Sequence, residues 1–437
     1  MCSSDLLIFS AVTVWSGALF IRQIADKNKI YRKTSDLTKE EKRISKKKCQ
    51  RKQKIYLFII IAFNLSLLFI VKYFFPVFSH PIALPLGISF YSLQAISYLV
   101  DVYGEKYEPQ HNFGKILLYL CWFPQLIQGP INRYDLIETD LFKTYRINAH
   151  DFRYAFYIFM FGAVKKYAIG DLLAPIVNSA LNDNSGSFPG SYLLFGAILF
   201  AIEQYADFSG GIDMAMGASL LFGVKLNNNF RQPYFSSSLA EFWRRWHISL
   251  GRWFREYLYI PLGGNRKGMT RTLLNLFIVF AATGIWHGAS WNFLIWGLWH
   301  ALFIIIERIG FGKVLEKHKF FGHVYSVVVV MLGFVIFRIE DLSYLTGYLR
   351  IMFDPVNNFA GGYSVFEFMG NKTLIAFAAA VIAAGAYRLL IEQSRAGGVF
   401  TALKFRPAEE VYCFLLLSLS ILQLISGTYN PFIYYRF

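Results

Sequence analysis

The chain of 437 residues is 55% hydrophobic, 18% aromatic and only 16% charged, with a mean hydropathy of +0.39. Ordinary soluble domains are less apolar and more highly charged, so the composition excludes a protein built on one soluble core. The formal net charge of +16 does not predict nucleic-acid binding, because the main basic block lies between two apolar segments and carries a single aromatic residue, Tyr31, rather than a series that could stack on bases.

Apolar segments long enough to cross a bilayer, which takes about 20 residues, recur along the chain. Backbone groups at membrane depth must be hydrogen-bonded internally, so these segments predict an all-α, polytopic integral membrane protein. We expect about 11–13 transmembrane, re-entrant and interfacial helices in a single domain over residues 1–437. The predicted helices are 5–22, 55–78, 81–103, 114–128, 152–170, 189–206, 211–224, 271–286, 291–308, 323–338, 342–353, 371–391 and 409–426.

The first two helices flank a basic segment, 23–54, and between Lys27 and Lys54 it holds 13 Lys or Arg residues against three acidic residues. Positively charged segments are retained in the cytoplasm, so this one is predicted to be a cytoplasmic loop that contacts anionic headgroups of membrane lipids. The four cysteines are scattered without a CxxC pair. The sequence therefore predicts neither a disulfide framework nor a metal site.

A second basic segment, 240–268, is too charged to span the membrane. Its apolar positions recur at helical spacing with arginines between them, which is typical of an amphipathic helix lying in the membrane interface. The helix is predicted to end at Pro261 and to be followed by the GGNRKG loop, Gly263–Gly268. Seven of the nine tryptophans lie between positions 243 and 299, a density that suits an interfacial belt or the wall of a ligand tunnel.

Three of the eight histidines directly follow a tryptophan: His247, His287 and His300. Only His287 opens a short break, HGAS, between two apolar helices. An ionisable group at membrane depth indicates function by default, and dry surroundings favour a neutral ring that can accept a proton. Two interpretations of His287 stay open: a general base, or a structural histidine hydrogen-bonded at the helix break. His247 suits the lipid interface or a second site position, whereas His300 suits packing or the interface.

Several enzyme signatures are missing from the sequence. There is no HExxH motif of a zinc protease, no GxSxG elbow of a serine hydrolase, and no Walker or GxGxxG phosphate loop. What remains is a candidate base without a nucleophile of its own. We therefore expect the substrate to supply a hydroxyl group and a bound donor to supply the leaving group.

Longer motifs resemble the membrane-bound O-acyltransferase (MBOAT) family, and most closely its bacterial alginate O-acetylase branch. The principal motifs are 227-NNNFRQPYFSSSLAEFWRRWHISLGRWFREYLYIPLGGNRKG-268 and 284-GIWHGASWNFLIWGLWHA-301. Further matches are 84-LPLGISFYSLQAISYLVDVY-103, 123-FPQLIQGPINRY-134, 204-QYADFSGGIDMAMG-217 and 430-NPFIYYRF-437. Together they cover most of residues 80–305 and the C-terminus.

The resemblance implies a funnel-like fold of transmembrane helices with re-entrant pieces. It places the family histidine at His287 and the family's second site position at His247. It also implies a cytoplasmic acyl-CoA, such as acetyl-CoA, or an acyl-carrier thioester as the donor, with no bound cofactor. His287 would deprotonate the hydroxyl of an acceptor that enters from outside.

The basic residues near the GGNRKG loop suit the phosphates of the donor, although contact with lipid headgroups explains them equally well. The candidate substrate- and donor-binding residues are Arg244, Arg245, Trp246, Arg255, Asn265, Arg266, Trp286, Ser290 and Asn292.

The resemblance predicts a multi-pass enzyme of the bacterial inner membrane that acetylates an exported polysaccharide. It also predicts an extracytoplasmic SGNH-type acetyltransferase as a partner. Two alternatives remain open. One is D-alanyl transfer to teichoic acid, which uses the same histidine. The other is a transporter, although the paired broken helices that many transporters carry in two symmetric halves are not evident in the sequence.

Overall fold

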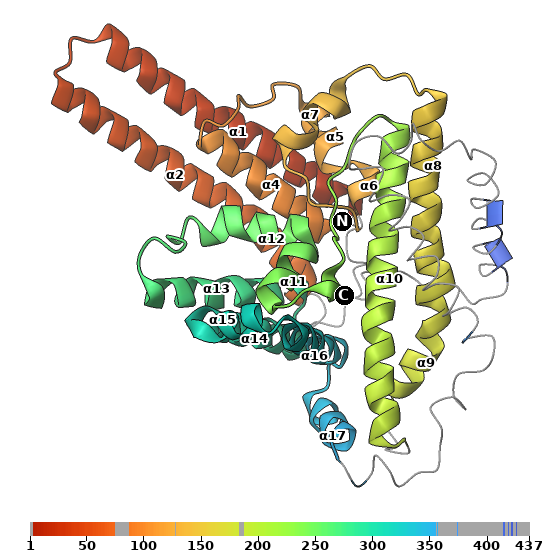
Figure 1. Ribbon diagram of the computed structural model, residues 1–437. Helices are drawn as coiled ribbons and strands as arrows, with labels where there is room; N and C mark the ends of the chain where they lie inside the picture. Colours follow the sequence, from red (N-terminus) through yellow and green to blue (C-terminus); the bar gives the residue numbers. More distant parts are fainter. Residues whose placement is uncertain are drawn as a thin grey trace. The chain divides into compact units, whose positions relative to one another are not determined.

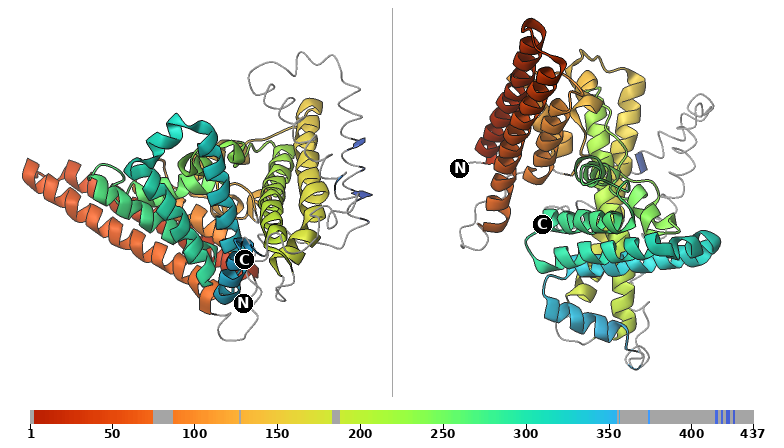
Figure 2. Two further views of the ribbon diagram at one scale, coloured as in Figure 1. Left: turned by 60° about the horizontal axis from the view of Figure 1, so that its bottom comes forward. Right: turned by 90° about the vertical axis from the view of Figure 1, so that its left-hand side faces the viewer.

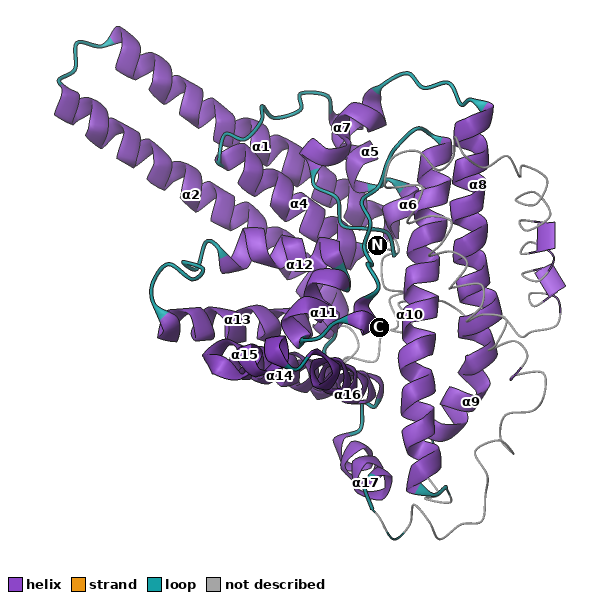
Figure 3. Ribbon diagram, in the orientation of Figure 1, coloured by secondary structure: helices purple, strands orange, loops and turns teal. Residues whose placement is uncertain are grey.

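The computed structural model of the protein describes residues 3–74, 87–126, 128–182 and 188–354, with a few isolated positions beyond them (Figure 1). Within the described residues all regular structure is helical, and no strand is found (Figure 3). Almost all of the predicted helices 371–391 and 409–426 lies outside the described residues, as does the C-terminal motif 430–437.

Five helices within the described residues are long and apolar enough to cross a membrane. They are Asp5–Thr34, Lys39–Tyr73, Met269–His287, Trp291–Lys317 and Lys319–Arg338. The all-α, polytopic membrane fold that the composition predicts is therefore confirmed.

The chain forms two compact units. Unit 1 comprises the residues up to 147, together with 222–228 and 249–267. Unit 2 comprises 148–221, 229–248 and the residues from 268 onward. Unit 2 therefore contains both His247 and His287, whereas most of the GGNRKG loop belongs to unit 1.

Unit 1 is built from a long helical hairpin and a set of shorter helices. The hairpin helices α1 (Ser3–Thr34) and α2 (Lys39–Phe69) run antiparallel side by side, and α4 (Ile88–Tyr103) packs against both (Figures 1 and 2). The other elements are η1 (Ile70–Phe74), α5 (Phe113–Leu120), α6 (Phe123–Leu126), α7 (Tyr134–Phe142), α12 (Ile248–Phe254) and η4 (Arg255–Tyr259). All of α12 except its first residue, Ile248, belongs to unit 1.

The basic segment 23–54 is helical, which corrects the prediction of a loop. Only the turn 35–38 separates the end of α1 from the start of α2. Thr38 Oγ1 accepts a hydrogen bond from the Glu41 N–H, and Glu41 Oε2 accepts one from the Thr38 N–H at 2.8 Å. This capping box starts α2. Lys, Arg, Gln and Glu are good helix formers, so the segment needs no apolar stripe to be helical.

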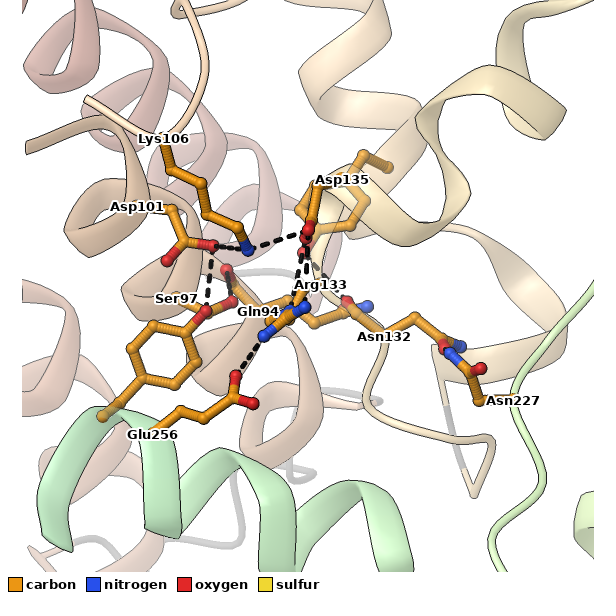
Figure 4. Close-up of polar contacts among 11 residues, drawn as sticks. Gln94, Ser97, Asp101, Lys106, Asn132, Arg133, Asp135, Asn227 and Glu256 are labelled. Atoms are coloured by element: carbon orange, nitrogen blue, oxygen red, sulfur yellow. Dashed lines mark hydrogen bonds and ion pairs between the residues drawn. The ribbon is translucent and has the colours of Figure 1, made fainter. Parts of the chain in front are cut away.

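A network of charged side chains joins three elements of unit 1 (Figure 4). Lys106 Nζ lies 3.2 Å from Asp101 Oδ2 on α4 and 2.8 Å from Asp135 Oδ2 on α7. Arg133, just before α7, pairs with both Asp135 and Glu256 of η4. The alternating charges therefore hold η4 against α4 and α7 inside the protein.

The segment 240–268 is not one interfacial helix, which corrects the prediction. It is divided into α11 (Leu239–Arg245), α12 and η4, followed by a turn that ends at Gly268. Helical geometry breaks at Trp246, which is extended, and at His247, whose φ is +44°. The helical spacing in the sequence is real on each side of the break, but the spacing alone does not reveal the break itself.

Unit 2 contains two groups of helices that pack within it. α10 (Gly190–Leu221) runs alongside α8 (Ala149–Ala163), and α14 (Trp291–Ile306) packs against α13 (Met269–His287) and α16 (Lys319–Arg338) (Figure 1). The other elements are η2 (Val164–Gly170), α9 (Asp171–Leu181), η3 (Pro233–Phe235), α11, η5 (Glu307–Phe311), α15 (Gly312–Lys317) and α17 (Leu342–Met352). One apolar core runs through α10, α11, α14 and α16.

α10 is one continuous helix, which corrects the prediction of two separate helices, 189–206 and 211–224. Gly210 faces α8, where a Cβ would lie 2.7 Å from the Gly162 carbonyl oxygen. Gly217 faces the Ala155 carbonyl oxygen in the same way, at 2.6 Å. The glycines therefore allow two backbones to approach closely, as small residues commonly do between membrane helices.

Two consecutive lysines bring positive charge into the contact between η2 and α10. Lys166 Nζ lies 2.5 Å from Asp207 Oδ1 and 2.8 Å from Asp171 Oδ1, and the lysine is 1% exposed. Lys165 Nζ lies 2.5 Å from Asp213 Oδ2. The wider π-helical turn of η2 points both lysines inward, so that each meets a carboxylate of α10. Asp207 and Asp213 of α10 thus form an ion-paired helix contact with the two lysines of η2.

Replacing Lys166 with Met should destabilise the protein by about 3–5 kcal/mol, because it leaves two carboxylates without their cation in a buried setting. Lys143→Met is the matched control, since Lys143 is more exposed and pairs with one carboxylate, Asp140, among the described residues. It should cost less than about 1 kcal/mol. Thermal unfolding of the purified protein in detergent measures both. Equal shifts for the two variants would contradict the buried ion pair.

Candidate active site

His287 is the last residue of α13, where the helix gives way to the extended residue Gly288. Its side chain is 6% exposed. The rings of Trp286, Trp296 and Phe337 meet the imidazole edge to face, with centroid distances of 4.9, 5.0 and 5.2 Å. The structure therefore places the polar ring in an aromatic box, with two of the predicted site residues, His287 and Trp286, side by side.

The helices on either side of this break are in backbone contact. A Cβ on Gly284 of α13 would collide with the Phe293 carbonyl oxygen, and one on Gly297 of α14 would collide with the Phe280 carbonyl oxygen. A Cβ on Gly288 would collide with the Phe293 ring. Three glycines thus fix the close α13–α14 hairpin that positions His287 at its tip.

Asn292 and Ser290 occupy the start of α14. Asn292 is fully buried, and its Nδ2 donates a hydrogen bond of 2.7 Å to the carbonyl oxygen of Phe337. This bond holds the end of α16, and with it the Phe337 ring, against His287. Ser290 is the residue before the helix, and its carbonyl oxygen accepts from the Phe293 N–H at 3.2 Å. The contacts seen for both residues are thus structural, and their predicted role in substrate binding stays a prediction.

His247 lies between α11 and α12 in the left-handed backbone region, with a φ of +44°. Few residues other than Gly adopt this conformation; Asn, Asp and His are the most frequent. The Ile248 N–H donates to the Asn229 carbonyl oxygen at 3.0 Å, and Asn229 Nδ2 lies 3.3 Å from His247 Nδ1. The segment that contains Asn229 therefore holds both the backbone and the ring of His247 in place.

The His247 side chain is 2% exposed and so does not face lipid, whereas its role as a second site position stays a prediction. It packs edge to face on Phe208 of α10 at 4.9 Å, within the protein and away from lipid. Burial lowers the pKa of His247 to about 3. The ring is therefore neutral at physiological pH, and Nδ1 can accept a hydrogen bond from Asn229 if the proton resides on Nε2.

The tryptophans of α11 and its C-terminus connect the surroundings of the two histidines. Trp246 is 4% exposed and lies 6.1 Å from Phe208, which in turn contacts His247. Trp243, one turn earlier, lies 5.7 Å from Trp296 of the His287 box. These rings therefore pack against one another inside unit 2, and the ligand tunnel that the tryptophan density suggests stays a prediction.

Glu307, which follows α14, holds α11 in place. Its carboxylate accepts hydrogen bonds from the backbone N–H groups of Leu239 at 2.6 Å and Ala240 at 2.9 Å. These N–H groups lie in the first turn of α11, where they have no partner within the helix. A residue distant in sequence thus positions the helix that carries Trp243.

The predicted donor-binding residues divide between the two units. In unit 2, Arg244 is exposed, and Arg245 pairs with Glu241 of the same helix at 2.6 Å. In unit 1, Arg255, Asn265 and Arg266 are all exposed. The last two lie in the turn formed by Gly263 and Gly264, whose φ values of +110° and +55° favour glycine. Their predicted role in binding donor phosphates stays a prediction.

Sequence reasoning missed several residues that shape this site. Glu307 and Asn229 act through backbone contacts that no local motif reveals. His300 is fully buried beside Trp296, and so is not interfacial. The sequence signal that could have singled out His300 is the Trp-His pair, which recurs at His247 and His287. Lys166 could have been found from its position within an apolar helix, where a charge needs a partner.

Comparison with known proteins agrees with this architecture. Residues 104–339, more than half of the chain, match the membrane-bound O-acyltransferase family. The probable alginate O-acetylase AlgI of Pseudomonas putida is 34% identical over 375 residues, covering 82% of this chain and 76% of that protein. The chain therefore belongs to the membrane-bound O-acyltransferase family, and the family resemblance predicted from its motifs is confirmed.

Other relatives differ in their named activity and in how much of them the chain covers. The probable alginate O-acetylase of Pseudomonas aeruginosa is 41% identical over 267 residues, 60% of this chain and 50% of that protein. The peptidoglycan O-acetyltransferase of Helicobacter pylori is 34% identical over 60% of this chain and 55% of that protein. The teichoic acid D-alanyltransferase of Bacillus subtilis is 26% identical over 54% of this chain and 61% of that protein. The chain thus spans about half the length of several curated relatives that it matches.

Because the backbone at His247 is left-handed, we expect substitutions at this position to affect stability in an unusual order. Asn adopts this conformation readily, whereas Leu is strained there by about 1–2 kcal/mol. His247→Asn should therefore destabilise the protein less than His247→Leu, although the site is apolar and buried. The same two substitutions at His300, which lies within an ordinary helix, should show the opposite order. Thermal unfolding in detergent measures all four variants, and the same order at both sites would count against backbone strain.

Removal of the Glu307 carboxylate should loosen α11. Glu307→Leu leaves two backbone N–H groups without an acceptor and should destabilise the protein by about 1–3 kcal/mol. Glu316→Leu, at an exposed position of α15, is the control and should change stability little. Hydrogen exchange of the Leu239 and Ala240 amides reports the effect directly. Unchanged protection in Glu307→Leu would contradict this role.

Proposed function

We propose that this chain transfers an acyl group, most simply acetyl, from a cytoplasmic thioester donor across the membrane to hydroxyl groups of an exported polysaccharide or to a partner transferase. The observation that carries the proposal is the His287 ring, buried in an aromatic box at a helix break. A polar ring placed there at the expense of packing is explained if it takes part in proton transfer. Membership in an acyltransferase family supplies the reaction class.

In the proposed reaction His287 acts as the general base. It accepts the proton of the acceptor hydroxyl as the hydroxyl oxygen attacks the thioester carbonyl carbon, forming a tetrahedral intermediate. When the intermediate collapses, the carbon–sulfur bond breaks and the protonated imidazole returns the proton to the departing thiolate. The products are an ester and a free thiol. His247, neutral and held by Asn229, lies within the same unit as His287.

Acetyl-CoA is the first donor to test, with an acyl-carrier thioester as the second. An exported polysaccharide as acceptor is supported by the alginate O-acetylases among the relatives. By the same analogy we place the chain in a bacterial inner membrane, beside an extracytoplasmic SGNH-type acetyltransferase that would receive the acetyl group.

D-alanyl transfer to teichoic acid is less well supported. The D-alanyltransferase relative is 26% identical, compared with 34% to 41% for the alginate O-acetylases. A transporter is disfavoured by membership in an acyltransferase family. A proton-gating histidine in a transporter would also leave the thioester donor uncleaved, which the following experiment detects.

His287→Ala should lower the release of CoA from acetyl-CoA, and the transfer of labelled acetyl to an acceptor, by about 10²- to 10⁴-fold, the usual contribution of a general base. The purified protein in detergent or nanodiscs is assayed for both products. The control is His318→Ala, since His318 is exposed and lies outside the aromatic box.

Unaltered thermal stability of His287→Ala would show that the loss is chemical. Wild-type rates in this variant would refute the role of His287. A wild-type protein that turns over neither acetyl-CoA nor an acyl-carrier thioester would refute the proposed reaction. Activity only with a D-alanyl carrier thioester would support the alternative.

A further inference from the structure

Three aromatic side chains of unit 2 form a cluster beside His287. His300 projects from α14 and is 0% exposed. Its ring centroid lies 5.0 Å from that of Trp243 and 5.1 Å from that of Trp296, and the two indoles are 5.7 Å apart. Each ring thus contacts the other two. Trp296 also contacts His287 at 5.0 Å, so the cluster adjoins the aromatic box.

The polar atoms of this cluster have no hydrogen-bond partner in the part of the chain that the structure describes. Both ring nitrogens of His300 and the Nε1 atoms of Trp243 and Trp296 are buried without one. Buried polar groups are nearly always hydrogen-bonded, and an unsatisfied group lowers stability. Phenylalanine could fill the same space without this penalty, so packing alone does not explain the residue types.

Trp299, another tryptophan of α14, makes the kind of hydrogen bond expected of a tryptophan whose role is packing. Trp299 Nε1 donates a hydrogen bond of 2.9 Å to the Val329 carbonyl oxygen of α16. The indole N–H of this neighbouring tryptophan on the same helix is therefore satisfied by a backbone carbonyl oxygen. The nitrogens of Trp296 and His300, on the same helix, lack such a bond within the described residues.

α16 is shaped to receive the His300 ring. A Cβ built on Gly333 would lie 2.8 Å from His300 Nε2 and 3.1 Å from Cε1. Only a glycine at position 333 leaves this ring its present place. The backbone of α16 and the two indoles therefore confine His300 on three sides.

The chemistry of the four nitrogens indicates what they bind. An indole is a donor only, and a neutral imidazole carries one donor and one acceptor. The cluster therefore offers three N–H donors and a single acceptor nitrogen, which suits an oxygen atom that accepts hydrogen bonds. We propose that Trp243, Trp296 and His300 bind the carbonyl oxygen of the acyl thioester next to His287. This inference rests on the proposed function and assigns a substrate group to these three residues.

The role in the reaction follows from the movement of charge. When the acceptor oxygen attacks the carbonyl carbon, the C=O double bond opens and its electron pair moves onto the oxygen, while His287 holds the hydroxyl proton. Donors aimed at that oxygen stabilise its negative charge in water-excluded surroundings. When the carbon–sulfur bond breaks, the double bond reforms and the thiolate receives the proton from His287.

The test separates loss of hydrogen bonding from loss of folding. Trp296→Phe and Trp243→Phe each remove one N–H, and His300→Phe removes both imidazole nitrogens. Each variant should lower kcat for acetyl-CoA by tenfold or more, with a smaller change in KM, because the interaction strengthens in the transition state. His300→Phe should be at least as stable to heat as wild type. His300→Asn, which retains a donor and an acceptor, should recover part of the lost kcat.

Trp291→Phe is the matched control, because Trp291 lies on the same helix but is 69% exposed. It should leave kcat and KM unchanged. If the wild-type protein turns over acetyl-CoA and His300→Phe is equally active, the carbonyl-binding role is overturned and the proposed function stays intact. The carbonyl-binding role would also be overturned if His300→Phe lost both activity and much of its thermal stability and His300→Asn recovered neither. That pattern is typical of a residue whose role is packing. Absence of wild-type turnover with every thioester would instead overturn the proposed function itself.

Discussion

Every polar group that enters a membrane has to find its partner inside the protein, and most of this structure follows from that requirement. Lys166 meets two carboxylates, and Glu307 meets the free N–H groups of a short helix. Asn292 meets the last turn of a neighbouring helix. Each such pairing fixes the distance between two elements, so the same bonds that satisfy polar atoms also determine the geometry around His287. Against this background the His300 cluster stands out because four unsatisfied nitrogens gather on three adjacent rings beside His287.

Backbone contact between helices is the second constraint. Gly162 and Gly210 allow α8 to approach α10, and Gly284 and Gly297 do the same for α13 and α14. In a lipid surrounding, association gains little from excluding water and depends on dense packing, which small residues promote. The glycines that break a helix in a sequence-based reading therefore join helices in the folded protein. At the HGAS break the same principle places a histidine at the tip of a tight hairpin, where packing on three sides limits its movement.

The sequence revealed the helical class, the family motifs and His287, because each depends on local composition or on a run of neighbouring residues. It did not reveal where 240–268 breaks, since helical spacing is continuous across Trp246 while the backbone turns at His247. Nor did it reveal Glu307, whose partners lie 67 and 68 positions away. The helical state of 23–54 was missed for another reason: a capping box and good helix formers suffice there without an apolar stripe. Contacts distant in sequence, and the backbone state of single residues, therefore needed the folded structure.

The hairpin of α1 and α2 has a consequence for how charged molecules reach the protein. The two helices contain 32 and 31 residues, so at 1.5 Å per residue each is about 46–48 Å long. A hydrocarbon core of about 30 Å leaves about 16–18 Å of basic helix beyond that core. Salt screens charge over about 8 Å at physiological ionic strength, so the positive field extends into solution ahead of the lipid surface. A polyanion that approaches the membrane therefore meets the basic end of this hairpin first. This attraction should speed its capture in dilute salt, and the effect should disappear in concentrated salt.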